Sequence, residues 1–180
     1  GAAADHKETM LTMERLPSAP KINFQQDTMT CKDRTCVLKG AASCMSYLGY
    51  KRLAHVLAND LLKGSKMDKG FDYFKYVMDS SRLERDERKC FQFVKLKTNP
   101  KHWDILKDSS DYLMCLVALL ADDSKTDHAI AISGKWIFDS NMEFALPLCK
   151  ESLDLCCSND IEKNHYVGVT RVYMLKRIKK

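Results

Sequence analysis

The chain is 180 residues long, and its hydrophobic fraction of 45% and charged fraction of 29% are typical of one globular domain with a real core. Its formal net charge of +5 permits an acidic or nucleic-acid partner, bound through a basic C-terminal tail, but no nucleic-acid-binding motif accompanies that charge. The longest apolar run, residues 112–121, is too short to span a bilayer, so no membrane partner is expected.

The N-terminal half of the chain predicts an irregular start followed by helices. Residues 1–20 are polar and contain two prolines near their end, which predicts a disordered or loosely attached N-terminus. Residues 21–27 predict a short edge strand or an extended segment. Apolar residues then recur at helical spacing in three segments, at residues 36–48, 52–62 and 71–78. The small residues at positions 40–43 predict that the first helix packs closely against another element.

The second half of the chain changes to the alternating pattern that is typical of strands. Strands are expected at residues 91–97, 112–120, 128–133, 135–139 and 166–175. A helix is predicted over residues 145–157, with Pro147 in its first turn, where a missing N–H costs least. Helices followed by a mostly antiparallel sheet predict an α+β domain whose N-terminal helical lobe packs on the sheet. Its expected bounds are residues 21–176, which leaves residues 177–180 as a basic tail.

The chain contains eight cysteines, at positions 31, 36, 44, 90, 115, 149, 156 and 157. No Cys-x-x-Cys pair occurs among them, so neither a zinc site nor any other cofactor is predicted. Cys44 and Cys115 lie in apolar segments and are expected to be small core residues. We therefore expect a reduced, intracellular compartment, cytoplasmic or nuclear, whereas disulfides would indicate an oxidising one.

Three residues have the positions that a nucleophilic site requires. Cys36 stands where a helix is expected to begin, and the partial positive charge of a helix N-terminus favours a thiolate and a developing oxyanion. His128 opens a predicted strand, and Asp139 closes the next one after a short turn at Gly134. Such a hairpin brings the start of one strand beside the end of the other. The pattern therefore predicts a Cys-His-Asp site.

Each of these residues also has a simpler explanation. Cys36 fits an ordinary first-turn residue, and His128 fits a structural histidine. Asp139 and Asn141 together fit an Asx turn that closes the strand, and Asn141 is the rival orienting group. His165 opens the last predicted strand and is the main rival base, although no carboxylate follows it at hairpin distance.

The segment CVLKGAASCM after a polar turn, together with DYLMCLVALLADDSKTDHAIAISGKWIFDSN, resembles the papain-like cysteine peptidase superfamily, and above all its bacteriocin-leader-processing peptidases. The resemblance covers residues 33–49 and 112–141. It implies a papain-like fold that cleaves a protein or peptide substrate through an acyl-enzyme, without a cofactor. It also implies Cys36 as the nucleophile, His128 as the general base and then acid, and Asp139 as the orienting group.

Two further resemblances give alternatives. The segment DRTCVLKGAA is similar to the Asp-x-x-Cys opening of ovarian-tumour-type deubiquitinases, which place their histidine near the end of the domain and would favour His165. Similar domains also occur in mobile-element proteins of protists, so an element-encoded origin is a further alternative.

The chain departs from the papain-like pattern around the cysteine. Thr30 occupies the usual place of the oxyanion-hole glutamine, which leaves Gln25 and Gln26, further back, as the candidates. Gln25 has the expected spacing to Cys31, which makes Cys31 the rival nucleophile, although polar residues follow it. Val37 stands where a small residue usually follows the cysteine. These departures leave, as an alternative, a catalytically inactive module that binds a protein or a nucleic acid.

Overall fold

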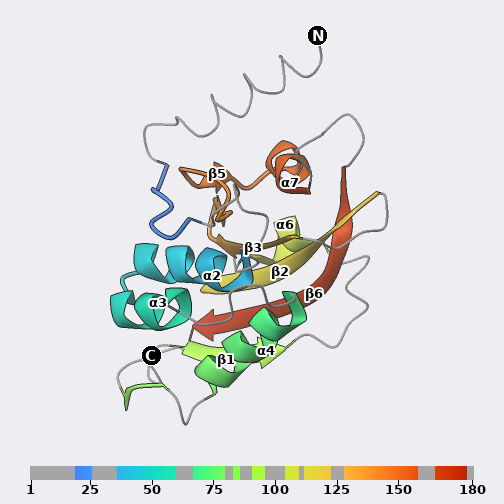
Figure 1. Cartoon of the computed structure of the whole chain (residues 1–180). Helices are drawn as coiled ribbons and strands as arrows, with labels where there is room; N and C mark the ends of the chain where they lie inside the picture. Colours follow the sequence, from blue (N-terminus) through green and yellow to red (C-terminus); the bar gives the residue numbers. More distant parts are fainter. Residues whose placement is uncertain are drawn as a thin grey trace.

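The computed structural model describes residues 19–25, 36–59, 67–79, 83–85, 91–95, 104–109, 112–122, 128–157 and 165–177. Its strands are β1 (Phe91–Lys95), β2 (Met114–Ala121), β3 (His128–Ser133), β4 (Trp136–Phe138), β5 (Leu146–Pro147) and β6 (Tyr166–Arg177). They form one antiparallel sheet in the order β1-β6-β2-β3-β4-β5 (Figure 1). The helices are α2 (Cys36–Tyr47), α3 (Lys51–Ala58), α4 (Met67–Met78), α6 (Ile105–Asp108) and α7 (Lys150–Cys157). The predicted α+β class with helices and an antiparallel sheet is confirmed.

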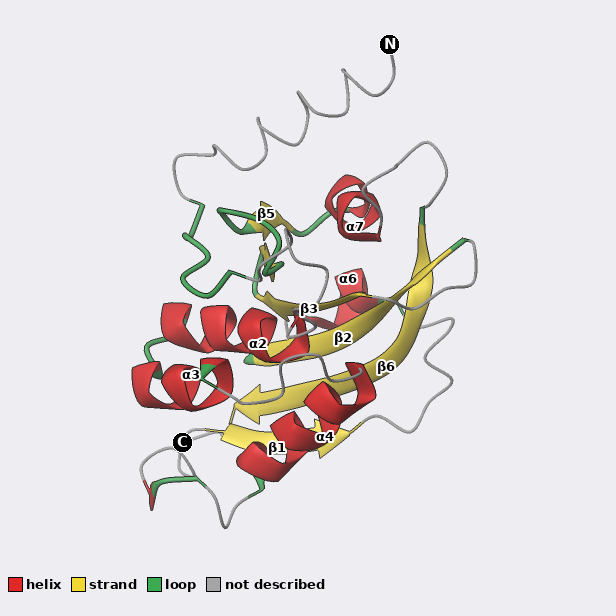
Figure 2. Cartoon of the chain, in the orientation of Figure 1, coloured by secondary structure: helices red, strands yellow, loops and turns green. Residues whose placement is uncertain are grey.

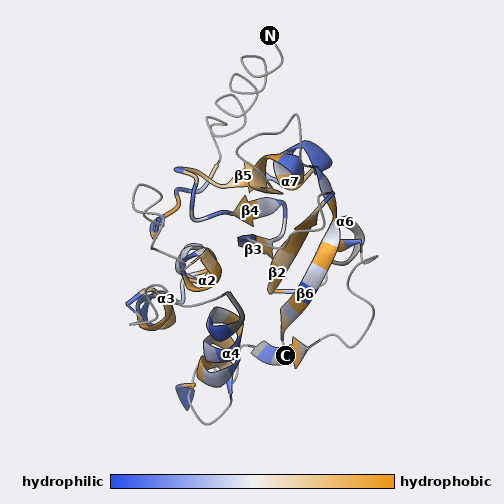
Figure 3. Ribbon diagram, turned by 45° about the vertical axis from the view of Figure 1, so that its right-hand side comes forward, coloured by the Kyte–Doolittle hydropathy of each residue, from blue (hydrophilic) through white to orange (hydrophobic). Residues whose placement is uncertain are grey.

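Helices cover both faces of the sheet. Helices α2, α3 and α4 lie together on one side (Figure 2), and Figure 3 shows α6 and α7 on the other side of β2 and β6. All residues of β2 are buried, which explains why its sequence is a continuous apolar run. Met114, Leu116 and Ala118 belong to the core under α2, whereas Cys115, Val117 and Leu119 belong to the core under α7.

Helix α2 lies against the backbone of the sheet because Gly40 has no side chain. A Cβ atom at Gly40 would lie 3.3 Å from the carbonyl oxygen of Phe138 and 3.6 Å from the backbone nitrogen of Ala131. Ala41, Ala42 and the rest of this short stretch of small residues are buried as well. The predicted close approach is confirmed, and it fixes α2 over β3 and β4.

A second glycine explains how the chain accommodates Val37. Val37 is 1% exposed, and Gly70 of α4 packs directly on its side chain. A Cβ atom at Gly70 would lie 3.0 Å from Cβ of Val37, which is tighter than nine in ten real Cβ contacts. The large residue after Cys36 is therefore matched by a missing side chain on the neighbouring helix.

The sequence predictions fail at two helix starts. Helix α7 begins at Lys150, and Pro147 lies in β5, where Leu146 and Pro147 pair with Ile137 and Trp136. An edge strand tolerates proline because its outer N–H groups need no ladder partner. Helix α4 begins at Met67, earlier than the predicted start at residue 71.

The extended start of the described chain is anchored on α2 and on the loop before β5. Lys21 forms an isolated bridge with Phe144, and the Ile22 backbone N–H donates to the Glu143 carbonyl at 2.9 Å. Ser43 of α2 accepts a hydrogen bond from the Phe24 backbone N–H at 3.1 Å. The prediction of an extended segment at residue 21 is confirmed up to residue 25.

Arg177, the first residue of the predicted tail, lies in β6, where it pairs with Phe91. Pro20, the last residue of the predicted loose N-terminus, accepts a hydrogen bond from the Ala145 N–H at 2.7 Å. The rest of both predictions, residues 1–18 and 178–180, lies outside the described residues.

Candidate functional site

Cys36 is the first residue of α2 and is only 5% exposed. Gly40 lies one turn further along α2 and rests on the backbone of β3 and β4, which brings the start of the helix to the start of β3. The first N–H groups of a helix have no partner within the helix, so they are free to bind a negative charge. The predicted helix start at Cys36 is therefore present, and it is buried against the sheet.

His128 and Asp139 are joined across the β3–β4 hairpin. Nε2 of His128 lies 2.7 Å from Oδ1 of Asp139, and the two residues are 9% and 1% exposed. The hairpin turn is tight, because Ser133 pairs with Trp136 and Gly134 adopts a left-handed φ of +57°. Continuing this register by one residue sets Asp139 opposite Ile130, on the same face as His128 and one diagonal step away. The pairing predicted from the sequence is present.

Cys36 lies close to the His128 ring, because its charge and a hydrogen bond with it are among the causes that raise the pKa of His128. Since Nε2 is occupied by Asp139, Nδ1 is the ring nitrogen that remains for the sulfur. The imidazole therefore lies between a thiol and a carboxylate, each supplied by a different element. This is the geometry in which a histidine removes a proton from a nucleophile while an acid fixes its orientation.

The charges in this cluster support one another. Burial alone would lower the pKa of His128, but the Asp139 charge and the hydrogen bonds to Asp139 and Cys36 raise that pKa well above its ordinary value of 6.5. Burial would likewise raise the pKa of Asp139, but the His128 charge and hydrogen bond and the Asn141 N–H lower it below its ordinary value of 3.8. The histidine is therefore held as an imidazolium and the acid as a carboxylate near neutral pH.

Asn141 supports Asp139 through its backbone. Its N–H donates to Oδ1 of Asp139 at 2.9 Å, while its own side chain is exposed. The Asx turn that competed as a simple explanation is therefore present together with the His128 contact. Gln25, a candidate oxyanion donor, directs Nε2 to the Met142 carbonyl at 3.0 Å. Gln26, Thr30 and Cys31 lie outside the described residues.

His165 lies in a different part of the sheet. It is half exposed, and its Nδ1 lies 3.8 Å from Oδ2 of Asp154 in α7, a carboxylate that hairpin spacing could not reveal. Leu119 pairs with both His128 and Val169, and after a β-bulge Ala121 pairs with Tyr166. His165 is therefore displaced by three residues of β2, about 10 Å along the strands, from the row of His128. The structure brings Cys36 to His128 and pairs His165 with Asp154 instead.

Cys156 is the site neighbour that the sequence reasoning missed. It lies in the last turn of α7, is 5% exposed, and is among the groups that lower the pKa of Asp139, after burial, His128 and Asn141. Only the docking of α7 against the sheet brings these residues together, so no local spacing indicated the contact. Cys44 and Cys115 are fully buried, which confirms that they are core residues. The six cysteines of the described ranges are free thiols.

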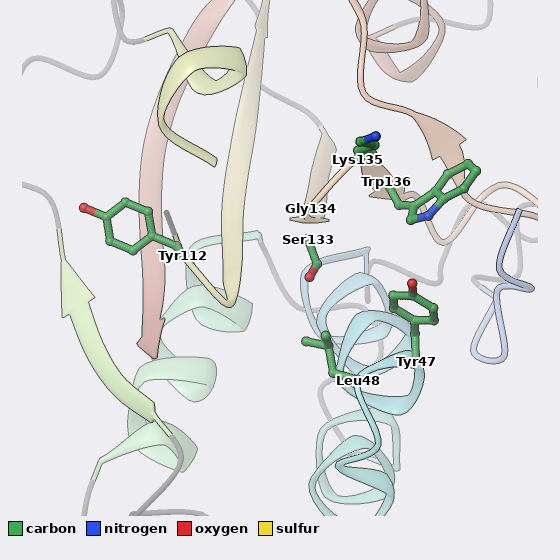
Figure 4. Close-up of a pocket in the computed structure, with 7 residues that line it drawn as sticks. All are labelled: Tyr47, Leu48, Tyr112, Ser133, Gly134, Lys135 and Trp136. Carbon is green, nitrogen blue, oxygen red and sulfur yellow. The ribbon is translucent and has the colours of Figure 1, made fainter. Parts of the chain in front are cut away.

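A surface pocket of about 360 Å³ lies at the opposite end of α2. It is lined by Tyr47, Leu48, Tyr112, Ser133, Gly134, Lys135 and Trp136 (Figure 4). These residues surround the far end of β3, whereas the Cys36–His128 contact lies at its beginning, a separation of about 17 Å along α2. The pocket is therefore separate from the Cys36–His128–Asp139 cluster.

Comparisons of the chain with family models, with curated proteins and with solved structures give no match. In the described ranges, no group of three or more His, Cys, Asp or Glu side chains is arranged to hold a metal ion. Across the same ranges, no helix has both the length and the apolar character needed to cross a membrane.

Proposed function

We propose that this protein is a cysteine peptidase or isopeptidase that works through an acyl-enzyme on Cys36. The observation that carries the proposal is the buried His128, which contacts Asp139 at 2.7 Å with Nε2 and lies close enough to Cys36 that this residue helps to raise its pKa. A cysteine from α2 therefore meets a histidine and an acid from one hairpin, which are the residue types of a nucleophile, a base and an orienting acid.

The reaction follows from the protonation states. The Cys36 thiolate attacks the carbonyl carbon of an amide bond, and the N–H groups at the start of α2 stabilise the oxyanion. His128, as an imidazolium, gives its proton to the departing amine when the C–N bond breaks. Water then attacks the thioester and gives a proton to His128, after which the C–S bond breaks and the thiolate returns. Asp139 keeps the ring oriented in both steps.

An amide substrate suits a histidine whose pKa is raised. Amines leave poorly without a proton, and a ring that stays charged near neutral pH supplies one. A raised pKa of His128 thus supports the proposal of a peptide or isopeptide bond in a protein or peptide substrate.

The burial of the cluster supports a second candidate, a catalytically inactive module on the same scaffold. Cys36, His128 and Asp139 are each less than one tenth exposed. A site that never opens would bind a protein or nucleic-acid partner elsewhere without cutting it. The two candidates differ in whether a small acyl donor reaches Cys36.

The test uses p-nitrophenyl acetate and measures both p-nitrophenol release and the intact mass of the protein. The hydrolase predicts one acetyl group on Cys36, which water then removes, and no turnover in Cys36→Ser. Cys149→Ala and Cys31→Ala are the controls, because Cys149 is more exposed than Cys36 and Cys31 is the rival nucleophile. Acetylation that is slow, spread over other cysteines or unchanged in Cys36→Ser would reject the proposal and favour the binding module.

A further inference from the structure

Three polar groups that have no partner in the described ranges line the pocket at the far end of α2. They are the hydroxyl of Tyr47, the ammonium of Lys135 and the indole N–H of Trp136, and within those ranges none of them has a hydrogen bond or an ion pair. Figure 4 shows the Tyr47 hydroxyl and the Trp136 indole nitrogen directed toward each other. Each of the three groups can donate a hydrogen bond, so together they suit a ligand that accepts.

The walls of this pocket are held in place by the fold. The Tyr47 ring packs on the buried Phe138 ring, with 5.4 Å between the two centroids. The Lys135 carbonyl accepts a hydrogen bond from the Leu148 N–H at 2.8 Å, and the Trp136 side chain is half buried against the core. The pocket is therefore formed before a ligand arrives, which lowers the entropic cost of binding.

The charge of the pocket favours a carboxylate as the acceptor. Lys135 is the one charged residue among the described residues that line it, so an anion there would meet no acidic side chain from this lining. The Ser133 hydroxyl donates to the Leu113 carbonyl at 2.7 Å and is not a further donor. One ammonium balances a singly charged carboxylate, whereas a nucleoside phosphate with two or more charges would stay largely unpaired.

We propose that this pocket binds an aromatic carboxylate, a ligand whose carboxylate lies a few bonds from an aromatic ring. The carboxylate pairs with Lys135 and accepts from Tyr47 and Trp136, while the ring packs against the aromatic lining. The pocket volume of about 360 Å³ suits one ring with its acid group, because ligand pockets range over roughly 300–1,000 Å³. Such a group belongs to a free small acid or to the C-terminal residue of a peptide. The inference does not depend on the proposed hydrolase, because the pocket is separate from the Cys36–His128–Asp139 cluster.

The experiment follows the indole N–H resonance of Trp136 by NMR in the full chain, assigned by its loss in Trp136→Phe. The probes are N-acetyl-L-tryptophan and its amide, which share the ring and differ in the carboxylate. The acid is expected to shift the resonance and to bind about tenfold more tightly than the amide. Lys135→Gln is expected to remove this difference, and Tyr47→Phe to weaken binding of the acid about threefold. Lys69→Gln is the matched control, because it removes the same charge from an exposed lysine of α4 that does not line the pocket.

The proposal is overturned if neither probe shifts the resonance at concentrations up to about 10 mM, or if the acid and the amide bind equally well. It is also overturned if Lys69→Gln weakens binding as much as Lys135→Gln. Two further probes distinguish the sources of the carboxylate: indoleacetate is a free acid, and acetyl-Ala-Ala-Ala-Trp presents the same ring at a peptide C-terminus. Tighter binding of the peptide assigns the ligand to a chain end, and tighter binding of indoleacetate assigns it to a small acid. Since these measurements need no turnover, they test the pocket even if Cys36 proves unreactive.

Discussion

The face of the sheet under α2 and the face under α7 contribute to the site by different means. On the α2 face, Gly40 and Gly70 lack the side chains that would hold the helices away, so steric fit sets the position of Cys36. On the α7 face, Asp139 is held by hydrogen bonds from His128 and Asn141. The position of Cys36, the proposed nucleophile, is thus set by packing, and the position of Asp139 by polar contacts. Changes on the two faces should therefore have separable effects on stability and on protonation.

The largest effect is expected where the two faces meet, at His128. His128→Asn removes both the proton acceptor and the link between Cys36 and Asp139, so acetylation of Cys36 should fall by about three orders of magnitude or more. Stopped-flow release of p-nitrophenol measures the rate. His165→Asn is the matched control and should keep the wild-type rate, because His165 pairs with Asp154. A large loss in the His165 variant and none in the His128 variant would reverse the assignment.

The next effect tests the packing of the α2 face. Gly40→Val adds a branched side chain where even a Cβ would lie 3.3 Å from the Phe138 carbonyl oxygen, so we expect it to destabilise the fold by about 3 kcal/mol. Lys39→Val controls for the lower helix propensity of valine, because position 39 is only half buried. Denaturant unfolding measures both variants. Equal losses of unfolding free energy in the two variants would show that α2 does not lie against the sheet at Gly40.

The dependence of stability on pH tests the polar contact between His128 and Asp139. Because the pKa of His128 is raised in the folded state, its contribution to stability is fully present below pH 6.5. This contribution is lost as the pH rises through the folded-state pKa. A lowered pKa of Asp139 adds stability that is present above 3.8 and is lost as the pH falls through its folded-state pKa. Each unit of displacement corresponds to about 1.4 kcal/mol, so the contribution of the pair should be largest between these two values.

The measurement compares the free energy of unfolding of the wild type with that of the double variant His128→Asn/Asp139→Asn between pH 3 and pH 9. The double variant removes both titrating groups and serves as the reference. A constant difference across this range would mean that neither pKa differs between the folded and unfolded states, which would contradict the raised pKa of His128 and the lowered pKa of Asp139.

The smallest effect concerns the fit of Val37 against α4. In the wild type, Gly70→Ala should cost about 1 kcal/mol, because overpacking against Val37 exceeds the gain in helix propensity. In a Val37→Ala background, the same change should cost less, because the contacts with the two Cγ atoms of Val37 are gone while the contact with Cβ at 3.0 Å remains. Thermal or denaturant unfolding of the four proteins gives the coupling energy. Additive effects would contradict the contact between these residues.

The hairpin half of the site was predictable from the sequence because its geometry is local. The tight turn at Gly134 fixes the β3–β4 register, and the period of two along a strand then brings Asp139 to His128. The helical periodicity predicted the start of α2 at Cys36, and the small residues after it predicted close packing. These inferences needed only short-range rules.

The remaining parts depend on how distant elements dock. The contacts of Cys156 with Asp139, of Asp154 with His165 and of Gly70 with Val37 join segments that no local spacing connects. Pro147 was placed wrongly because proline suits both the first turn of a helix and an edge strand, and only the pairing with Trp136 decides between them.

Competitive alkylation by iodoacetamide at pH 6 tests whether His128 activates the Cys36 thiol, because an ordinary thiol is almost wholly protonated at this pH. Cys36 is 5% exposed and Cys149 is more accessible, so exposure alone would favour Cys149. The account predicts that Cys36 is alkylated first in the wild type, by intact mass and peptide mapping, and that His128→Asn removes this preference. Alkylation of Cys149 with an unmodified Cys36 in both proteins would contradict the thiolate–imidazolium pair.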